Sequence, residues 1–149
     1  EKAMAGGGIS INYAAHSLDK ICYLTQSDIA WATGSCTYLQ PGTDVDGSAQ
    51  MLLRTSSGIS ASISLCGYSV VHIDETMLFF ANGSLRLHTG SDLSVTCGSG
   101  YETVDTSSYP NAFEAQWADF ISGVRAGRIL YCDGTYGASI VRTIELLYH

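Results

Sequence analysis

A chain of 149 residues has the length of one domain and can bury a hydrophobic core. Apolar residues make up 46% of it and charged residues 14%, which excludes an intrinsically disordered protein. The net charge is −7 and the seven lysines and arginines are scattered, so the basic patch that nucleic-acid binding requires is missing. No apolar run approaches the roughly 20 residues of a membrane-spanning helix.

Three glycines, Gly6–Gly8, precede a predicted amphipathic helix over about residues 9–25. Its apolar stripe consists of Ile11, Ala15, Leu18 and Cys22. Beside this stripe runs a row of polar side chains at positions i, i+4, i+7 and i+11, which helical geometry places within an arc of roughly 60°. The row consists of Asn12, His16, Asp19 and Tyr23. The helix can therefore pack on a sheet while it shows the polar row at an edge.

Strand patterns fill the middle of the chain and are joined by glycine-containing turns. The predicted strands are residues 29–39, 48–55, 59–67, 76–81, 84–89, 92–97 and 101–105. Asn82-Gly83 is the strongest hairpin signal, and Gly34 is interpreted as a bulge in the first strand. We expect a sheet of about six or seven mostly antiparallel strands.

Residues 59–67 alternate most clearly between the two faces of that sheet. The apolar face carries Ile59, Ala61, Ile63 and Leu65. The opposite face carries Ser60, Ser62 and Ser64. A face of serines is flat and weakly hydrated, so it suits either water or a packed second subunit.

The hydrophobic period then changes from 2 to 3.6, which predicts two helices. The first ends near Gly127 and carries an apolar stripe, interpreted as core or interface, of Phe113, Trp117, Phe120, Ile121 and Val124. Asp133 can cap the second, whose stripe consists of Ile140, Val141, Ile144, Leu147 and Tyr148. This order predicts an α+β fold, in which helices cover one face of an open sheet and leave the other available for oligomerisation.

The five cysteines show no pair with the two-residue spacing of a metal or redox site. They are Cys22, Cys36, Cys66, Cys97 and Cys132. Each lies among apolar or small residues, so we interpret them as buried thiols of a reducing, cytoplasmic compartment. The histidines form no metal-ligand spacing either, and no metal site is expected.

His16 is the strongest candidate for chemistry, because imidazole has an ordinary pKa near 6.5 and exchanges protons at neutral pH. The residues alone equally allow a half-buried histidine bonded to a backbone carbonyl. Asp19 could tune His16 or bind sugar hydroxyls, or it could pair with Lys20 or solvent. Gly6–Gly8 fit a tight entry turn, since no phosphate-binding glycine pattern follows a strand.

Taken in order along nearly its whole length, the chain resembles the C-terminal domain of the Gfo/Idh/MocA oxidoreductases, the family of glucose–fructose oxidoreductase and inositol dehydrogenase. The most specific part is the opening, where three glycines precede a position usually held by aspartate, then a histidine and a second aspartate. Here these are Gly6–Gly8, Asn12, His16 and Asp19. Further matching segments are Asp46–Gly67, Asn82–Leu85, Phe113–Arg128 and Asp133–Tyr148.

The resemblance implies that residues 1–149 are the substrate and oligomerisation domain of a two-domain enzyme acting on a sugar, polyol or related hydroxyl or carbonyl compound. An N-terminal Rossmann domain would bind NAD or NADP, so this chain alone is expected to bind no cofactor and to be inactive. His16 would transfer a proton, and Asn12 would take the place of the family's aspartate. Asp19 and Tyr13 would contact the substrate.

Two positions depart from the family pattern. Asn12 replaces an aspartate, and an amide can hydrogen-bond a protonated imidazole but cannot stabilise its charge. Ala14 stands where the family often has glycine. The Asn12 departure keeps open a catalytically degenerate binding or regulatory protein, and the serine face of residues 59–67 keeps open a structural assembly module.

Overall fold

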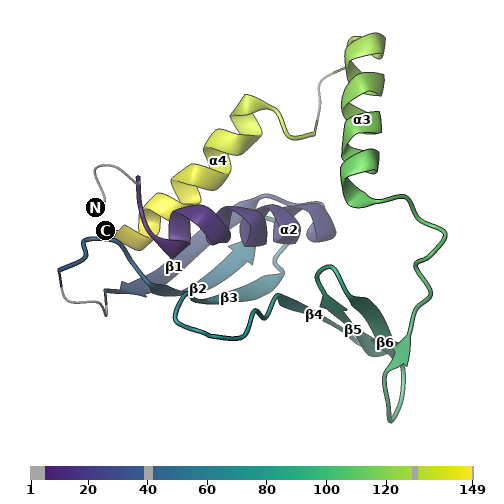
Figure 1. The fold of residues 1–149 in the computed structure, drawn as a ribbon, viewed down its shortest axis with the longest axis horizontal. Helices are drawn as coiled ribbons and strands as arrows, with labels where there is room; N and C mark the ends of the chain where they lie inside the picture. The colour runs from purple at the N-terminus through teal and green to yellow at the C-terminus, as the bar shows by residue number, and fades with distance from the viewer. Residues whose placement is uncertain (1–5, 39–41, 129–130, 149) are drawn as a thin grey trace. The chain divides into compact units, whose positions relative to one another are not determined.

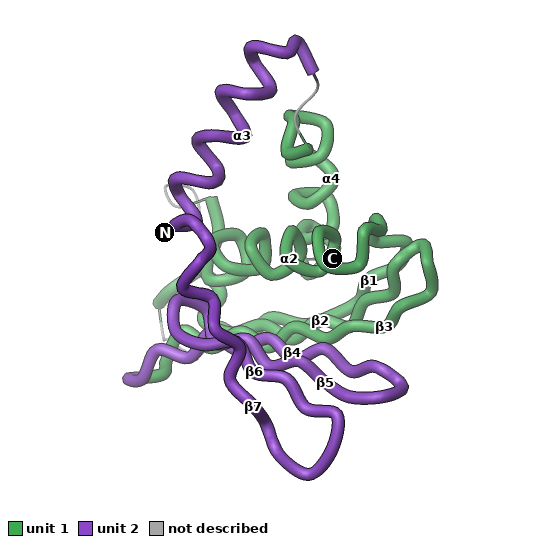
Figure 2. Tube along the Cα trace, turned by 90° about the vertical axis from the view of Figure 1, so that its right-hand side faces the viewer, with its two compact units in different colours: residues 1–69, 131–149 green, residues 70–130 purple. Residues whose placement is uncertain are grey.

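The computed structural model describes residues 6–38, 42–128 and 131–148 (Figure 1). Its elements in chain order are η1 (Ser10–Ala14, a π-helical turn), α2 (Ala15–Thr25), β1 (Ile29–Thr37), β2 (Ser48–Thr55), β3 (Ser60–Cys66), β4 (Glu75–Phe80), β5 (Gly83–His88), β6 (Asp92–Thr96), β7 (Glu102–Thr103), α3 (Ala112–Ala126), α4 (Gly134–Glu145) and the 3-10 turn η2 (Leu146–Tyr148). They divide into two compact units, residues 1–69 with 131–149 and residues 70–130 (Figure 2).

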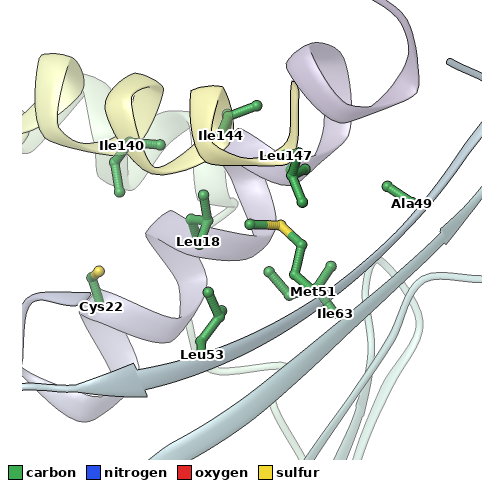
Figure 3. Packing of buried hydrophobic residues seen from close by; sticks show 10 residues of the cluster. Leu18, Cys22, Ala49, Met51, Leu53, Ile63, Ile140, Ile144 and Leu147 are labelled. Carbon is green, nitrogen blue, oxygen red and sulfur yellow. The ribbon is translucent and has the colours of Figure 1, made fainter. Parts of the chain in front are cut away.

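The first unit contains an antiparallel sheet of order β1-β2-β3 with α2 and α4 packed on one face. In β2 every second residue is buried, as the predicted period of 2 requires. Figure 3 shows Leu18 of α2, Met51 of β2 and Ile144 of α4 meeting in this core. The remaining buried hydrophobic residues of the cluster are Ala14, Cys22, Ala49, Leu53, Ile63, Ile140 and Leu147.

Gly34 pairs with Met51 in a regular part of the ladder, so its interpretation as a bulge was wrong. The irregularity lies between Ile29 and Trp31 instead. A Cβ at Gly34 would overlap the carbonyl oxygen of Gln50 and lie 2.5 Å from Cδ2 of Leu147. This glycine therefore serves close packing of η2 against β1 and β2.

The other face of this sheet is polar and exposed. The register aligns Thr33, Leu52 and Ser62 across the three strands. The next row along consists of Ser35, Gln50 and Ser64. Ser60, Ser62 and Ser64 are all exposed, while Ile63 is buried on the helix side, which confirms the alternation predicted for β3.

The second unit contains an antiparallel sheet of order β4-β5-β6-β7. The hairpin predicted at Asn82-Gly83 is present, but its two turn residues are Ala81 and Asn82, and Gly83 pairs with Phe80. Gly83 has an ordinary negative φ, so the turn does not use its conformational freedom. A Cβ there would overlap the carbonyl oxygen of Thr96, so β6 passes too close for any other residue.

Helix α3 is capped at its start by Asn111, whose side chain accepts a hydrogen bond of 2.9 Å from the Phe113 amide. It ends at Gly127, which adopts the left-handed conformation with φ 63°. Within the described residues its predicted apolar stripe is mostly exposed, with Phe113 80% and Trp117 65% accessible. These side chains are not part of the core of this unit, which leaves the interface interpretation open.

The α+β class is confirmed, and the helices of the first unit cover one face of an open sheet. The seven described strands form two hydrogen-bonded sheets instead of the single sheet that was expected, because residues 67–74 join no ladder. All five cysteines lie among the described residues and all are thiols. The expected burial holds for Cys22 but was wrong for the three exposed cysteines, Cys66, Cys97 and Cys132. No helix of the described residues is long and apolar enough to span a membrane.

Candidate functional site

The start of the first helix is held by one buried carboxylate, that of Asp46, which is 3% exposed. One oxygen, Oδ1, accepts hydrogen bonds from the Gly8 amide at 3.0 Å and from the Tyr148 hydroxyl at 2.7 Å. The other, Oδ2, accepts from the Ser10 amide at 2.8 Å and from the Ser10 hydroxyl at 2.6 Å. A buried charge is tolerated only when it is fully hydrogen-bonded, and these four donors meet that condition.

Gly8, the last of the three glycines, is required by this contact. A Cβ at Gly8 would lie 2.5 Å from the Asp46 amide nitrogen and 2.6 Å from Oδ1. The next amide, of Ile9, donates to the Asp46 carbonyl oxygen at 2.9 Å. At the predicted tight entry turn the backbone of residues 8–10 therefore packs closely against Asp46. The amides of Gly8, Ile9 and Ser10 all donate to Asp46.

Burial by itself raises the pKa of the Asp46 carboxyl, but the hydrogen bonds from Ser10 and Tyr148 outweigh burial and lower that pKa below its ordinary value. Burial and then the neighbouring carboxylate raise the pKa of the Tyr148 phenol, which therefore stays protonated and able to donate. At neutral pH Asp46 is therefore ionised and Tyr148 is neutral, so the hydrogen bond from the phenol to the carboxylate is retained.

Immediately after this contact the helix takes a π-helical turn at Ser10–Ala14 before it continues as α2. Such turns insert an extra residue into a helix and often occur at functional sites. Its inner residues, Ser10 and Ala14, are buried, whereas Asn12 and Tyr13 are exposed. The wide turn thus displays two of the predicted site residues next to the first turn of α2.

His16 is exposed in that first turn, and no hydrogen bond or ion pair with residues 6–38, 42–128 or 131–148 engages its imidazole. The half-buried, carbonyl-bonded histidine that the sequence also allowed is therefore not what the structure contains. Asn12, Tyr13 and His16 lie on the side of the helix away from the buried Ala14 and Leu18. Their polar atoms are available to a ligand.

Asp19, the next member of the predicted polar row, turns toward α4. Its Oδ1 accepts a hydrogen bond of 2.7 Å from the hydroxyl of Tyr136, and the Asp19 side chain is half-buried. No described residue is found bonded to Oδ2, which leaves one acceptor on this carboxylate. Burial, and after it the Asp19 carboxylate, raises the pKa of the Tyr136 phenol, so Tyr136 remains the donor.

A second group of titratable side chains lies on the four-stranded sheet. Nδ1 of His88 is 2.9 Å from Asp92 and its Nε2 is 3.6 Å from Glu75. These three residues oppose one another in the register of β4, β5 and β6, and the hydrogen bond from His88 lowers the pKa of Asp92. We interpret the group as a cross-strand ion pair. Among the described residues no three histidine, cysteine or acidic side chains are placed to hold a metal ion.

The structure thus brings together Asn12, Tyr13 and His16 and gives Asp19 a partner that the sequence did not suggest. Sequence reasoning missed the roles of Asp46, Tyr136 and Tyr148, which lie far along the chain from the residues they hold. The one available signal for Asp46 was its place in a segment that resembles the family. Nothing in the spacing of Tyr136 or Tyr148 distinguishes them from packing residues of a helix.

The chain is similar to known proteins in sequence pattern and in fold. A profile described as the GFO/IDH/MocA C-terminal domain matches residues 1–86. None of the curated proteins matches the sequence. Among solved structures, an aldose-aldose oxidoreductase from Caulobacter crescentus complexed with glycerol has a TM-score of 0.87 at 20% identity, covering 99% of this chain and 46% of that chain.

Two further solved structures are similar. A levoglucosan dehydrogenase in complex with NADH has a TM-score of 0.86 at 17% identity, covering 99% of this chain and 49% of that chain. A UDP-N-acetylglucosamine 3-dehydrogenase from Acidithiobacillus ferrooxidans has a TM-score of 0.79 at 18% identity, covering 94% of this chain and 46% of that chain. At these identities the likeness shows a shared fold, and the chain spans about half the length of these relatives.

Replacing Asp46 tests the contact that holds the helix start. Because the pKa of Asp46 is lower in the folded than in the unfolded chain, its contribution is present above the ordinary carboxyl pKa and is lost as the pH falls through the folded-state value. We expect Asp46→Asn to lower the free energy of unfolding by about 2–5 kcal/mol at pH 7. The amide NH2 group of asparagine would face hydrogen-bond donors of the protein and leave them without an acceptor. The difference should shrink below about pH 4.

Urea unfolding followed across pH measures this effect, with Asp28→Asn as the control at an exposed aspartate. The control should remain within about 0.5 kcal/mol of the parent protein. A loss for Asp46→Asn that stays constant from pH 7 to pH 3 would contradict the role assigned to the ionised carboxylate.

Proposed function

Because the chain belongs to the GFO/IDH/MocA family, we propose that it forms the substrate side of an NAD(P)-dependent oxidoreductase acting on a sugar, polyol or related hydroxyl compound. The proposal rests on one observation. Asn12, Tyr13 and His16 are exposed next to one another, directly after the segment that Asp46 holds by hydrogen bonds. His16 is the proton-transfer residue in this proposal, and Asn12, Tyr13 and Asp19 contact substrate or orient the imidazole.

The chemistry requires a base at this place. Hydride leaves a carbinol carbon only as the proton of its hydroxyl departs, so a base must lie within hydrogen-bond reach of that hydroxyl. The His16 imidazole is exposed, and histidine is the side chain that most often transfers protons in enzymes. In the reverse direction the same imidazole, once protonated, donates to the carbonyl oxygen of the substrate.

The dinucleotide, when bound, supplies the hydride acceptor or donor. Every strand pairing among the described residues is antiparallel, so they contain no parallel βαβ unit of the kind that holds a dinucleotide. We therefore assign NAD or NADP to an N-terminal Rossmann domain of the whole protein and expect this chain by itself to bind neither. Positioning of the cofactor against the substrate is then the task of both domains.

Neighbouring polar atoms can hold the substrate. The Asn12 amide can donate to one oxygen and accept from another, and the Tyr13 phenol adds a third group. Oδ2 of Asp19 can accept from a second hydroxyl, while its partner Tyr136 fixes the carboxylate. Asn12 brings no negative charge, so stabilisation of the protonated imidazole falls to Asp19, three residues away on the same helix.

A catalytically degenerate binding or regulatory protein is the second candidate, because Asn12 removes the carboxylate that the family usually has at this position. Substrate would then bind to the same exposed group without turnover. The five thiols, none in a disulfide, support a reducing and hence cytoplasmic setting for either function.

Turnover of the whole protein separates the two candidates. We expect His16→Ala to lower kcat with NAD or NADP by about 10²–10⁴, because proton transfer then falls to water. The control is His72→Ala, which removes an exposed histidine from the other unit and should leave turnover unchanged. Steady-state rates on a panel of sugars and polyols measure both variants.

Unchanged turnover in His16→Ala would remove His16 from the mechanism. A parent protein that is inert toward the whole panel, and in which Asn12→Asp produces no activity, would favour the degenerate protein. Recovery of activity in Asn12→Asp would instead show that the missing carboxylate is the reason for the inactivity.

We further propose that the exposed face of β1–β3 is a homo-oligomer interface, which would also suit a structural assembly module. That face combines short hydroxyl side chains with the exposed Leu52 (57%) and Trp31 (52%), and Arg54 is the only charged residue in its paired rows. A flat, nearly uncharged surface can pack against a copy of itself with little desolvation of charge.

Sedimentation of the whole protein tests the interface. We expect Leu52→Arg to shift the oligomer toward smaller species, because it buries an unpaired charge at the centre of the face. Leu146→Arg, at an exposed leucine of η2, is the matched control. A parent protein that remains monomeric at high concentration would contradict this proposal without affecting the catalytic one.

A further inference from the structure

We propose that the exposed tyrosines Tyr23 and Tyr131 form a second subsite that binds a neutral sugar ring, so that the substrate is a hexosyl disaccharide or glycoside. The inference rests on the proposed function, since it extends the same helix face beyond His16. Both tyrosines belong to the first unit, and neither has a role in the mechanism above.

The two side chains belong to a cluster of three rings. Tyr131 lies between the others, with its ring centroid 5.9 Å from that of Tyr23 at an interplanar angle of 83°. The Tyr136 centroid is 5.1 Å from that of Tyr131 at 46°. Tyr23 is 60% and Tyr131 45% exposed, so aromatic surface of both rings remains open to a ligand.

The cluster is held in place before any ligand arrives. The hydroxyl of Tyr136 donates to Asp19 at 2.7 Å, and the backbone amide of Tyr136 donates to the capping side chain of Asp133 at 2.8 Å. Tyr136 thus fixes the ring against which Tyr131 packs, and Tyr131 in turn supports Tyr23. A tyrosine has few rotatable bonds, so a supported pair costs little ordering entropy when it binds.

Its position continues the proposed active site. Tyr23 follows His16 by seven residues, about 10 Å along the axis of α2, and follows Asp19 by four residues, about 6 Å. A ligand that places a hydroxyl at His16 and also covers Tyr23 must therefore be longer than a single sugar ring. The free oxygen of Asp19 lies between them, where it can accept from a hydroxyl of either ring.

Charge selects a neutral occupant. The carboxylate of Asp19 accepts a hydrogen bond from Tyr136 of the cluster. Burial, and to a smaller extent the negative charge of Asp28, raises the pKa of the neighbouring Cys22 thiol. Lys20 is the only lysine or arginine of α2, in a chain of net charge −7. A diphosphate linker would meet repulsion here, whereas the C–H face of a sugar ring packs on an aromatic face without charge.

Matched substrates of the whole protein test the subsite. Rates with NAD or NADP are measured for glucose, maltose and cellobiose in the parent protein, Tyr23→Ala and Tyr23→Phe. We expect Tyr23→Ala to lower kcat/KM for a disaccharide about threefold to tenfold through KM, with glucose unchanged. Tyr23→Phe keeps the ring and should restore the parent value. Tyr109→Ala, at an exposed tyrosine of the other unit, is the control.

Several results would overturn the inference. An equal loss for glucose and the disaccharides means that Tyr23 packs on another part of the protein, and no loss for any sugar means that the ring is idle. If the parent protein turns over none of the sugars, NMR titration of the tyrosine ring signals with maltose and cellobiose decides. Binding that weakens in Tyr23→Ala supports the subsite even if the proposed catalysis fails, and absence of binding contradicts it. Shifts caused by UDP-N-acetylglucosamine but not by either disaccharide would contradict the neutral occupant.

Discussion

The buried carboxylate of Asp46 links three segments that are distant in the sequence. Through one side chain it joins the glycine run at Gly8, the first helical turn at Ser10 and the C-terminal turn at Tyr148. Leaving such a charge unpaired would cost far more than any single surface interaction gains, so all three partners must be in place together. The beginning of α2 is therefore fixed by tertiary contact and not by a side-chain cap of its own, which η1 and α2 lack.

This constraint is what presents the candidate site. The π-helical turn follows directly on Ser10, with its buried side toward Asp46 and its exposed side carrying Asn12 and Tyr13. One turn later the inner residues are packed on Met51 and Ile144, which leaves His16 facing solvent. A second carboxylate–phenol pair, Asp19 with Tyr136, ties the same helix to α4. In both pairs the phenol stays protonated and donates to the carboxylate, and both attach the helix to the C-terminal segment, beside a histidine to which no described residue is hydrogen-bonded.

The sequence predicted what local periodicity encodes. The bounds of β2, the cap at Asp133 and the serine face of β3 all follow from patterns of a few residues. Prediction from the sequence failed at residues whose role depends on segments far away in the chain. Gly34 and Gly83 read as a bulge and a turn residue, yet each is a glycine because another strand or turn approaches it. His16 was proposed from the sequence because proton-transfer chemistry favours histidine, whereas Asp46 and Tyr136 were missed because they act through partners 36 or more residues away.

In the proposed mechanism His16 faces the reacting hydroxyl of a sugar or polyol. A crystal structure of the whole protein with NAD or NADP and a turned-over sugar measures this as the distance from the imidazole Nε2 to the oxygen on the oxidised carbon. We expect a hydrogen-bonded separation of about 2.6–3.2 Å, with the sugar lying over the exposed face of the helix start. A sugar bound with that oxygen beyond the reach of His16, or on another surface of this chain, would contradict it.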